Sequence, residues 1–169
     1  MFKGIRVCIV TGTPGTGKTA IARELSILLR WKYFSPTRLV RKVSKEYDYV
    51  RRTYVVSPWV FRKAVKAMLF RFSQAEPPPE GVVIDSHMSH FLPSKWVDLC
   101  LVTSCSLRVL KRRLESRSYR AAKVRENLDA EIFDTCVIES QQAGHRILQL
   151  DTTRASPRTL ARHAAKLLK

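Results

Sequence analysis

The chain has 169 residues, 45% of them hydrophobic, which is enough for one domain with a substantial core. Lysine and arginine together number 31 and aspartate and glutamate 14, so the formal net charge is +17. No apolar run is long enough to span a membrane, and no signal-peptide cleavage site follows the N-terminal apolar stretch. We therefore expect a cytoplasmic protein without membrane contact. The excess cations predict proximity to a polyanion such as ribosomal RNA, although a merely solvated basic surface is the alternative.

The four cysteines give no sign of a metal site or a disulfide framework. They are scattered, they form no CxxC pair, and no histidine accompanies them at zinc spacing. Cys8 and Cys100 lie inside apolar runs and are expected to be buried thiols. This use of cysteine is typical of a reducing cytosol.

The N-terminal third begins as a strand, a loop and a helix. Residues 5–10 alternate and contain β-branched types, which predicts a buried strand. A loop rich in glycine, proline and threonine covers 11–17, and 18–30 carries apolar residues at helical spacing. A short strand is expected near 31–34.

The next segment is less regular. Ser35 or Thr37 is placed to cap a helix that carries apolar residues at 39, 40 and 43. Residues 47–57 predict no clear element. Pro58 then suits the first turn of a long basic helix that continues to about residue 72.

The second half again alternates strands with helices. The expected strands are 82–85, 97–103 and 146–150. The expected helices are 106–117 with Ser106 as its cap, 120–142 with Gly144 as its C-cap, and a terminal helix opened by Ser156 and Pro157. This order predicts a parallel α/β sheet covered on both faces, in a single domain over 1–169.

Residues 12–19 read GTPGTGKT and fit the phosphate-binding pattern G-x-x-x-x-G-K-[ST]. The glycines let the backbone turn so that successive N–H groups form an anion nest, and the following helix adds its positive end. Lys18 is expected to reach the β- and γ-phosphates of ATP, and the Thr19 hydroxyl to ligate Mg²⁺. The motif follows a predicted strand and opens a predicted helix, which is the context that this chemistry requires.

A second acidic element lies at the end of the predicted strand 82–85. Asp85 closes an apolar run, where P-loop enzymes hold Mg²⁺ or its water shell; capping of the following turn is the alternative role. His87 lies two residues on and shares the face of Asp85 on an extended chain. It is a candidate to orient water or relay a proton, although a lone histidine is more often structural.

An arginine-rich segment occupies residues 110–120. Arg113 and Arg117 are four residues apart and so lie on one helix face. Such a segment can close over the anionic transition state of phosphoryl transfer. A solvated charged face is an equally good interpretation of this pattern taken alone.

Together these motifs resemble those of a known protein family. The chain resembles the adenylate-kinase-like family known in eukaryotes as the coilin-interacting nuclear ATPase, or adenylate kinase isoenzyme six, which has archaeal relatives. The matching stretches are TGTPGTGKT at 11–19, LVRK at 39–42, VVIDSH at 82–87, LPSKWVDLCLV at 92–102 and RLESRSYRAAKVRENLDAEIF at 113–133. The Asp-x-His pair joined to the R-x-Y-x-x-x-K-x-x-x-N segment is more specific than the P-loop.

The resemblance implies a doubly wound, five-stranded parallel sheet with a monophosphate-binding region around 35–58 and a short lid around 116–126. It implies adenylate kinase activity, which converts ATP and AMP to two ADP, together with ATPase activity and Mg²⁺ as cofactor. It also implies a role in small-ribosomal-subunit maturation through binding a small-subunit ribosomal protein. The absence of an acidic or nuclear-targeting tail favours an archaeal-type, cytosolic member.

The same resemblance implies roles for individual residues. Lys18, Asp85, His87 and Arg117 are the implied catalytic residues, with Thr19 and Asp85 at the metal. The implied ATP contacts are Gly15, Thr16, Gly17, Lys18, Thr19, Ala20, Arg117 and Arg154. Arg41 is implied to hold AMP.

Two positions depart from the family pattern. Ser118 stands where a glycine is usual, and residues 51–53, Arg-Arg-Thr, replace an acidic stretch. Three other interpretations remain open at this point. They are an assembly ATPase with incidental kinase activity, a P-loop kinase for a metabolite such as shikimate or gluconate, and a basic RNA-binding module without turnover.

Overall fold

The computed structural model describes residues 2, 4–36, 46–48 and 53–168. The helix expected after residue 35, with its apolar positions at 39–43, lies largely outside the described residues. The strands are β1 (Arg6–Gly12), β2 (Lys32–Phe34), β3 (Glu46–Asp48), β4 (Thr53–Val55), β5 (Gly81–Asp85), β6 (Leu99–Ser104) and β7 (Ile147–Asp151). The helices are α1 (Lys18–Leu29), α3 (Pro58–Ser73), α4 (Leu107–Glu115), α5 (Ala121–Ile132), α6 (Thr135–Gln142) and α7 (Pro157–Lys166). Two short 3₁₀ helices cover Ser89–Phe91 and Ser94–Trp96.

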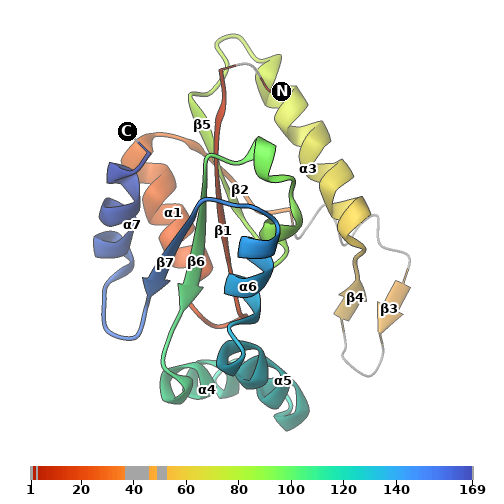
Figure 1. Cartoon of the computed structure of the whole chain (residues 1–169), viewed down its shortest axis with the longest axis vertical. Helices are drawn as coiled ribbons and strands as arrows, with labels where there is room; N and C mark the ends of the chain where they lie inside the picture. Colours follow the sequence, from red (N-terminus) through yellow and green to blue (C-terminus); the bar gives the residue numbers. More distant parts are fainter. Residues whose placement is uncertain (1, 3, 37–45, 49–52, 169) are drawn as a thin grey trace.

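Five strands form one sheet in the order β2-β5-β1-β6-β7, and every neighbouring pair is parallel. The chain leaves central β1 for one edge, returns through β5, and then continues to the other edge (Figure 1). The fold-class prediction of a five-stranded, doubly wound parallel sheet is confirmed. In such sheets, ligands bind outside the carboxyl ends of the strands where the winding direction changes, and the loop after β1 occupies that place.

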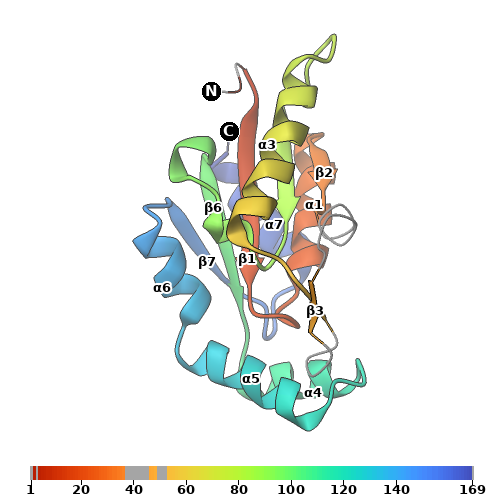
Figure 2. The same cartoon turned by 90° about the vertical axis from the view of Figure 1, so that its right-hand side faces the viewer.

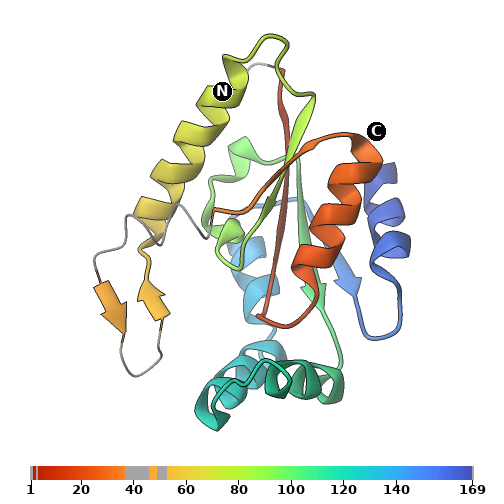
Figure 3. The same cartoon turned by 180° about the vertical axis from the view of Figure 1, so that it is seen from behind.

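Strand β1 shows why both faces of the sheet are covered. Its alternate residues point to opposite sides: Cys8 and Val10 pack with α1 and α7, whereas Val7 and Ile9 pack with α3 and the region of α6. Figures 2 and 3 show the two layers on either side of the sheet. Burial of these apolar runs is the main stabilising term of the fold, at about 25 cal/mol per Å².

Helices α4 and α5 lie beyond the carboxyl end of the sheet (Figure 1). They pack on each other around a small cluster of their own, made by Cys105, Leu110, Leu114 and Val124. The backbone N–H of Cys105 also donates to a carboxylate oxygen of Glu131 at 2.9 Å, which ties the start of α4 to the end of α5. The predicted lid, residues 116–126, falls on the turn between these helices and the first half of α5.

Several predicted boundaries need correction. The single helix expected over 120–142 is wrong: α5 ends at Ile132 and α6 begins at Thr135, because Asp134 takes a left-handed conformation with φ of 48°. Aspartate tolerates that conformation better than most residues, so no glycine marks the break. Ser106 does precede α4, but its side chain makes no capping hydrogen bond. The Ser156 side chain does cap its helix and accepts from the backbone N–H of Thr159.

The segment 47–57, for which the sequence predicts no clear element, contains part of a small antiparallel hairpin. Strand β3 pairs with β4 in the register Glu46 with Val55 and Asp48 with Thr53. The hairpin lies at the N-terminal end of α3, away from the main sheet (Figure 1). Residues 37–45 and 49–52 lie outside the described residues.

Two expectations from the sequence concern the cysteines and possible membrane spans. Cys8 and Cys100 are buried, and all four cysteines are free thiols. No helix in the described part of the chain is both long and apolar enough to cross a bilayer.

Candidate nucleotide site

The phosphate-binding loop joins the end of β1 to the start of α1. A Cβ atom at Gly12 would lie 2.3 Å from the carbonyl oxygen of Thr103, so only glycine allows β1 and β6 to approach this closely. Gly17 precedes α1 with φ of 94°, a conformation that favours glycine. The first N–H groups of α1 lack acceptors within the helix, and they give this end of α1 an affinity for anions.

Hydroxyl groups from neighbouring strands hold the loop in shape. Thr103, near the end of β6, donates to the carbonyl oxygen of Thr11 at 3.2 Å. Its oxygen lies 2.6 Å from the hydroxyl of Thr16, which also lies 2.8 Å from the carbonyl oxygen of Thr13. Thr16 and Thr103 are buried, so these bonds are shielded from water and fix the loop before any ligand binds.

Lys18 is the loop's cation. Its Nζ donates to the carbonyl oxygens of Gly12 and Thr13 at 2.7 and 3.0 Å. The pKa of Lys18 is lowered from 10.5 to about 8, mainly because the group is desolvated; the nearby carboxylate of Asp85 opposes the shift and Arg117 supports it. The ammonium group is therefore largely charged at pH 7, and an anion placed beside it would strengthen that charge.

Asp85 ends β5 beside the start of α1. Its Oδ2 accepts from the hydroxyl of Thr19 at 2.7 Å and from the phenol of Tyr33, on β2, at 2.8 Å. The carboxylate is only 5% exposed. Burial, followed by the hydrogen bond to Asp85 and the charge of that carboxylate, raises the pKa of Tyr33, so the phenol stays a donor at neutral pH.

Hard oxygen donors suit Mg²⁺, which is bound through one or two carboxylates together with substrate phosphates and water. The pair of Thr19 hydroxyl and Asp85 carboxylate fits that chemistry. Among the described residues, no three histidine, cysteine, aspartate or glutamate side chains gather to hold a metal. A metal at this pair would thus depend on phosphate and water for its remaining ligands.

His87 follows Asp85 in the turn after β5. Its side chain is exposed to solvent, and its carbonyl oxygen accepts from the hydroxyl of Thr11 at 3.4 Å. The pKa of His87 is lowered to about 4 by desolvation and then by the positive charges of Lys18 and Lys123, against the attraction of Asp85. The ring is therefore neutral at pH 7 and able to accept a hydrogen bond.

A second histidine, which the sequence did not single out, supports this turn from behind. His90 is 3% exposed, and its Nδ1 lies 2.8 Å from the hydroxyl of Thr11. Its Nε2 lies 2.9 Å from a carboxylate oxygen of Glu139, on α6, and its carbonyl oxygen lies 2.9 Å from Nε2 of His145. His90 thus connects the turn carrying His87 to β1 and α6.

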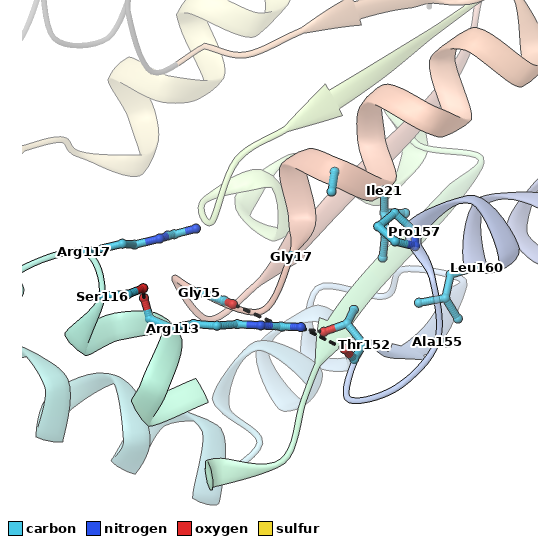
Figure 4. Close-up of a pocket in the computed structure, with 11 residues that line it drawn as sticks. Gly15, Gly17, Ile21, Arg113, Ser116, Arg117, Thr152, Ala155, Pro157 and Leu160 are labelled. Atoms are coloured by element: carbon cyan, nitrogen blue, oxygen red, sulfur yellow. Dashed lines mark hydrogen bonds between the residues drawn. The ribbon is translucent and has the colours of Figure 1, made fainter. Parts of the chain in front are cut away.

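Arg113, on α4, is anchored rather than free. Its guanidinium donates to the hydroxyl and carbonyl oxygens of Thr152, both at 3.0 Å, and to the carbonyl oxygen of Gly15 at 3.4 Å. Thr152 is buried, and its hydroxyl donates to the carbonyl oxygen of Thr16 at 2.8 Å. These bonds join α4 and the segment after β7 to the phosphate-binding loop (Figure 4).

A cavity of about 350 Å³ opens beside this loop. Arg117 extends towards it from the turn after α4 (Figure 4). One wall is largely apolar, and the lining residues are Gly15, Gly17, Ala20, Ile21, Arg113, Ser116, Arg117, Thr152, Ala155, Pro157 and Leu160. Ser118, where the resembled family has glycine, has φ of 56°, a conformation that glycine adopts at lower cost.

Most of the predicted site residues thus meet at the carboxyl end of β1 and β5. Gly15, Gly17, Ala20 and Arg117 line the cavity, while Lys18, Thr19 and Asp85 lie at the phosphate-binding loop. Arg154 is exposed and does not line the cavity, although the next residue does. Arg41 lies outside the described residues. The functional roles of all these residues remain predictions.

Tyr33, Thr103 and Thr152 belong to the same site but were missed by sequence reasoning. Each is a hydroxyl residue at or just after the carboxyl end of a predicted strand. In a parallel sheet those ends share one edge, so this position is the signal that could have identified them.

Comparison with known proteins identifies the broader family to which the chain belongs. Residues 8–134 match the family model described as an AAA domain. A protein of Methanocaldococcus jannaschii named "Putative adenylate kinase" is 34% identical over 146 residues, covering 85% of this chain and 75% of the relative. A protein of the same name from Thermococcus onnurineus is 31% identical over 166 residues, covering 95% and 82%.

Solved structures agree on the fold. A shikimate kinase from Acinetobacter baumannii aligns with a TM-score of 0.61 at 14% identity, covering 99% of this chain and 94% of that one. A sugar kinase from Janibacter sp. HTCC2649 aligns with a TM-score of 0.63 at 17% identity, covering 97% and 94%. At this identity the likeness shows the fold alone. The phosphate-binding loop and the sequence relatives go further: the chain belongs to the AAA-domain family of P-loop proteins, alongside these archaeal adenylate kinase homologues.

Proposed function

We propose that this protein is an adenylate kinase that transfers the γ-phosphate of Mg²⁺-bound ATP to AMP, and that it also hydrolyses ATP. The observation that carries the proposal is the meeting of Lys18, Thr19 and Asp85 at one end of the sheet, beside a cavity of nucleoside size. The four free thiols suit a reducing compartment, so we place the protein in the cytoplasm.

In this proposal ATP binds with its phosphates and its adenosine in two adjoining parts of the site. Its phosphates would lie on the phosphate-binding loop, where the N-terminal end of α1 and Lys18 supply positive charge. Its adenosine would lie in the cavity, against the apolar wall that includes Ile21, Pro157 and Leu160. Arg113 is held by Thr152 and shapes the cavity, which leaves Arg117 as the arginine available to the phosphates.

In the proposed transfer, an oxygen of the AMP phosphate forms a bond to the γ-phosphorus of ATP. The bond from that phosphorus to the β–γ bridging oxygen breaks, and two ADP molecules result. Lys18 and Arg117 would hold the phosphate oxygens as their charge grows. Mg²⁺, bound through Thr19 and Asp85, would supply further neutralisation of the β- and γ-phosphates. In hydrolysis, water replaces AMP, and the neutral His87 ring is a candidate to orient it.

The identity of the acceptor rests on two supports. The relatives from Methanocaldococcus and Thermococcus carry the name "Putative adenylate kinase", and the family resemblance implies that Arg41 holds the AMP phosphate. Kinases of shikimate and of a sugar share the fold, so metabolite acceptors belong in the same test. The test is chromatography of products after incubation with Mg²⁺-ATP and, in parallel, AMP, other nucleoside monophosphates, shikimate or gluconate.

We expect AMP to be the best acceptor, with two ADP formed for each AMP consumed once the ADP formed by hydrolysis without AMP is subtracted. ADP formation that is unchanged by AMP would identify an ATPase and remove the kinase assignment. Phosphorylation of shikimate or gluconate in preference to AMP would replace adenylate kinase with a metabolite kinase.

A second function, in small-ribosomal-subunit maturation, is supported by the net charge of +17 and by the family resemblance. In this function the nucleotide state controls binding of a small-subunit ribosomal protein, with ribosomal RNA close by. Such a partner is itself basic, so contact requires local acidic or apolar groups, or RNA between the two proteins.

The partner's affinity should be measured without nucleotide, with ADP and with a non-hydrolysable ATP analogue, for wild type and His87→Ala. We expect affinity to depend on nucleotide in the wild type and to lose that dependence in the variant. Equal affinity in all wild-type states would exclude the switch and leave a kinase with a basic surface.

A further inference from the structure

Helix α3 carries a stripe of aromatic and cationic side chains on its solvent side. Trp59, Lys63, Lys66 and Phe70 are spaced by four, three and four residues, which places them along one face of a helix. The two rings are 67% and 59% exposed. The opposite face is buried against the sheet by Phe61, Val65, Met68 and Leu69. The exposed rings therefore do not serve the core.

The stripe is unusually free of negative charge. Between Asp48 and Glu76 the sequence holds six lysines and arginines and no acidic residue. In the part of the chain that the structure describes, no carboxylate lies within ion-pair distance of Lys63 or Lys66. Like charges repel along such a face, so it is most stable when a polyanion lies against it.

The contact between two members of the stripe shows how the aromatic rings are presented. The ammonium group of Lys63 lies 5.2 Å from the centroid of the Trp59 ring, in a cation–π arrangement. Most of the Trp59 side chain still faces water, so a planar group can reach it. Exposed aromatic rings interleaved with cations are the combination that binds single-stranded nucleic acids, because bases stack on the rings while cations neutralise phosphates.

We propose that this face of α3 binds single-stranded RNA. Trp59 and Phe70 are stacking platforms for two bases, and Lys63 and Lys66 contact the phosphates between them. The rings are eleven residues apart, roughly 16 Å along the helix, a span that one short strand covers. The choice of RNA rests on the RNA proximity within the proposed function, whereas the site itself does not depend on phosphoryl transfer.

The test uses the full chain, without nucleotide, and fluorescence anisotropy of a labelled twelve-residue uridine oligonucleotide over a range of salt concentrations. Lys63→Ala/Lys66→Ala should weaken binding at least about tenfold and flatten the salt dependence by roughly 1.4 logarithmic units. The matched control is Arg158→Ala/Arg162→Ala, which removes the same charge from exposed positions on α7. It should change affinity less than about twofold. Equal weakening by both pairs would overturn the proposal, because net charge alone would then attract RNA.

The aromatic contribution has its own control. Trp59→Ala should weaken binding at least about fivefold, and Trp59→Phe should retain most of the affinity, because a ring remains for stacking. Phe133→Ala removes a ring that is 70% exposed in the turn after α5 and should have no effect. All these side chains are on the surface, so melting temperatures should be unchanged.

The nucleic acid is varied last. A thymidine DNA strand should bind comparably, since stacking and phosphate contacts do not read the 2′-hydroxyl, while duplex RNA should bind more weakly. Duplex RNA that binds as tightly as the single strand would overturn the stacking site. The adenylate kinase turnover of the Trp59→Ala variant is also measured without RNA. This measurement distinguishes failure of the RNA-binding proposal from failure of the proposed kinase function. Intact turnover with lost RNA binding supports the inference, and intact turnover with intact RNA binding rejects it.

Discussion

The hydroxyl of Thr19 donates a 2.7 Å hydrogen bond to Oδ2 of Asp85, although 66 residues separate the two in the chain. This contact joins the start of α1 to the end of β5 and brings two side-chain oxygens together beside the phosphate-binding loop. Tyr33 donates to the same carboxylate oxygen from β2. Two donors therefore hold this carboxylate in position before any metal or nucleotide binds.

Replacing Asp85 with asparagine should lower turnover at least about 100-fold, both with and without AMP. The reason is that Mg²⁺ in the proposed site would supply several kcal/mol of transition-state charge stabilisation and would lose the Asp85 carboxylate as a ligand. Tyr33→Phe is the matched control, because it removes one hydrogen bond and keeps the carboxylate, and it should cost less than about tenfold. Steady-state rates over a range of Mg²⁺ concentrations give both values. Wild-type turnover of Asp85→Asn at low Mg²⁺ would remove the metal role.

Lys18→Ala should abolish nearly all turnover, since the β- and γ-phosphates lose their main side-chain cation. The variant should stay folded, because the bonds of Thr16, Thr103 and Thr152 hold the loop independently of the lysine. Circular dichroism and thermal melting establish folding, and product formation from Mg²⁺-ATP establishes activity. A folded variant with wild-type activity is incompatible with the P-loop assignment.

Arg113, on α4, and Arg117, in the turn that follows it, should behave differently when changed to alanine. Arg117→Ala should lower kcat more than it weakens ATP binding, because its charge is needed where charge grows in the transition state. Arg113→Ala removes its hydrogen bonds to Thr152 and Gly15 and should lower the free energy of unfolding by about 1–3 kcal/mol. Steady-state kinetics and urea denaturation separate the two effects. An Arg117 variant with raised KM and intact kcat would argue against a catalytic arginine.

His90 should make the protein's stability depend on pH in the acid range. Burial, followed by His87, His145 and Lys18, lowers its pKa from 6.5 to about 4, and the close carboxylate of Glu139 opposes this. The unfolded chain binds a proton at this position below about pH 6.5, but the folded chain binds one only below about pH 4. The contribution of neutral, buried His90 to the free energy of unfolding is therefore fully present above pH 6.5. As the pH falls to 4, up to about 3 kcal/mol of it is lost.

Urea denaturation of wild type and His90→Gln across this range measures the contribution. The difference in unfolding free energy between the two proteins should shrink as the pH falls from 6.5 to 4. Parallel pH curves for the two proteins would show that His90 keeps an ordinary pKa.

How far the sequence predicts this site depends on whether a constraint is local. The phosphate-binding loop lies within eight residues, from Gly12 to Thr19, so its glycines and lysine can be identified from the sequence. Asp85 can also be identified as a site residue, because it ends an apolar run. Tyr33 and Thr103 reach the site only because β2 pairs with β5 and β6 pairs with β1. Such pairings are long-range, and no local pattern encodes them.

The fold shows the same division. Strand and helix periodicity predicts the sheet and most of its covering helices, because burial on two faces imposes a regular pattern. The break between α5 and α6 is different, since one aspartate in a left-handed conformation causes it and helical spacing continues across it. The path of α4 and α5 over the carboxyl end of the strands depends on contacts such as that of Cys105 with Glu131, which spacing does not predict.

The central claim, that the protein is an adenylate kinase, is tested most directly by running the reaction in reverse. The protein is incubated with Mg²⁺ and ADP alone, and the nucleotides are separated and quantified, with Lys18→Ala prepared identically to exclude a contaminating kinase. We predict that the wild type forms ATP and AMP at equal initial rates, before hydrolysis depletes the ATP, and that the variant forms neither. The formation of AMP and inorganic phosphate without ATP, or no conversion by an enzyme that still consumes ATP, would contradict the account.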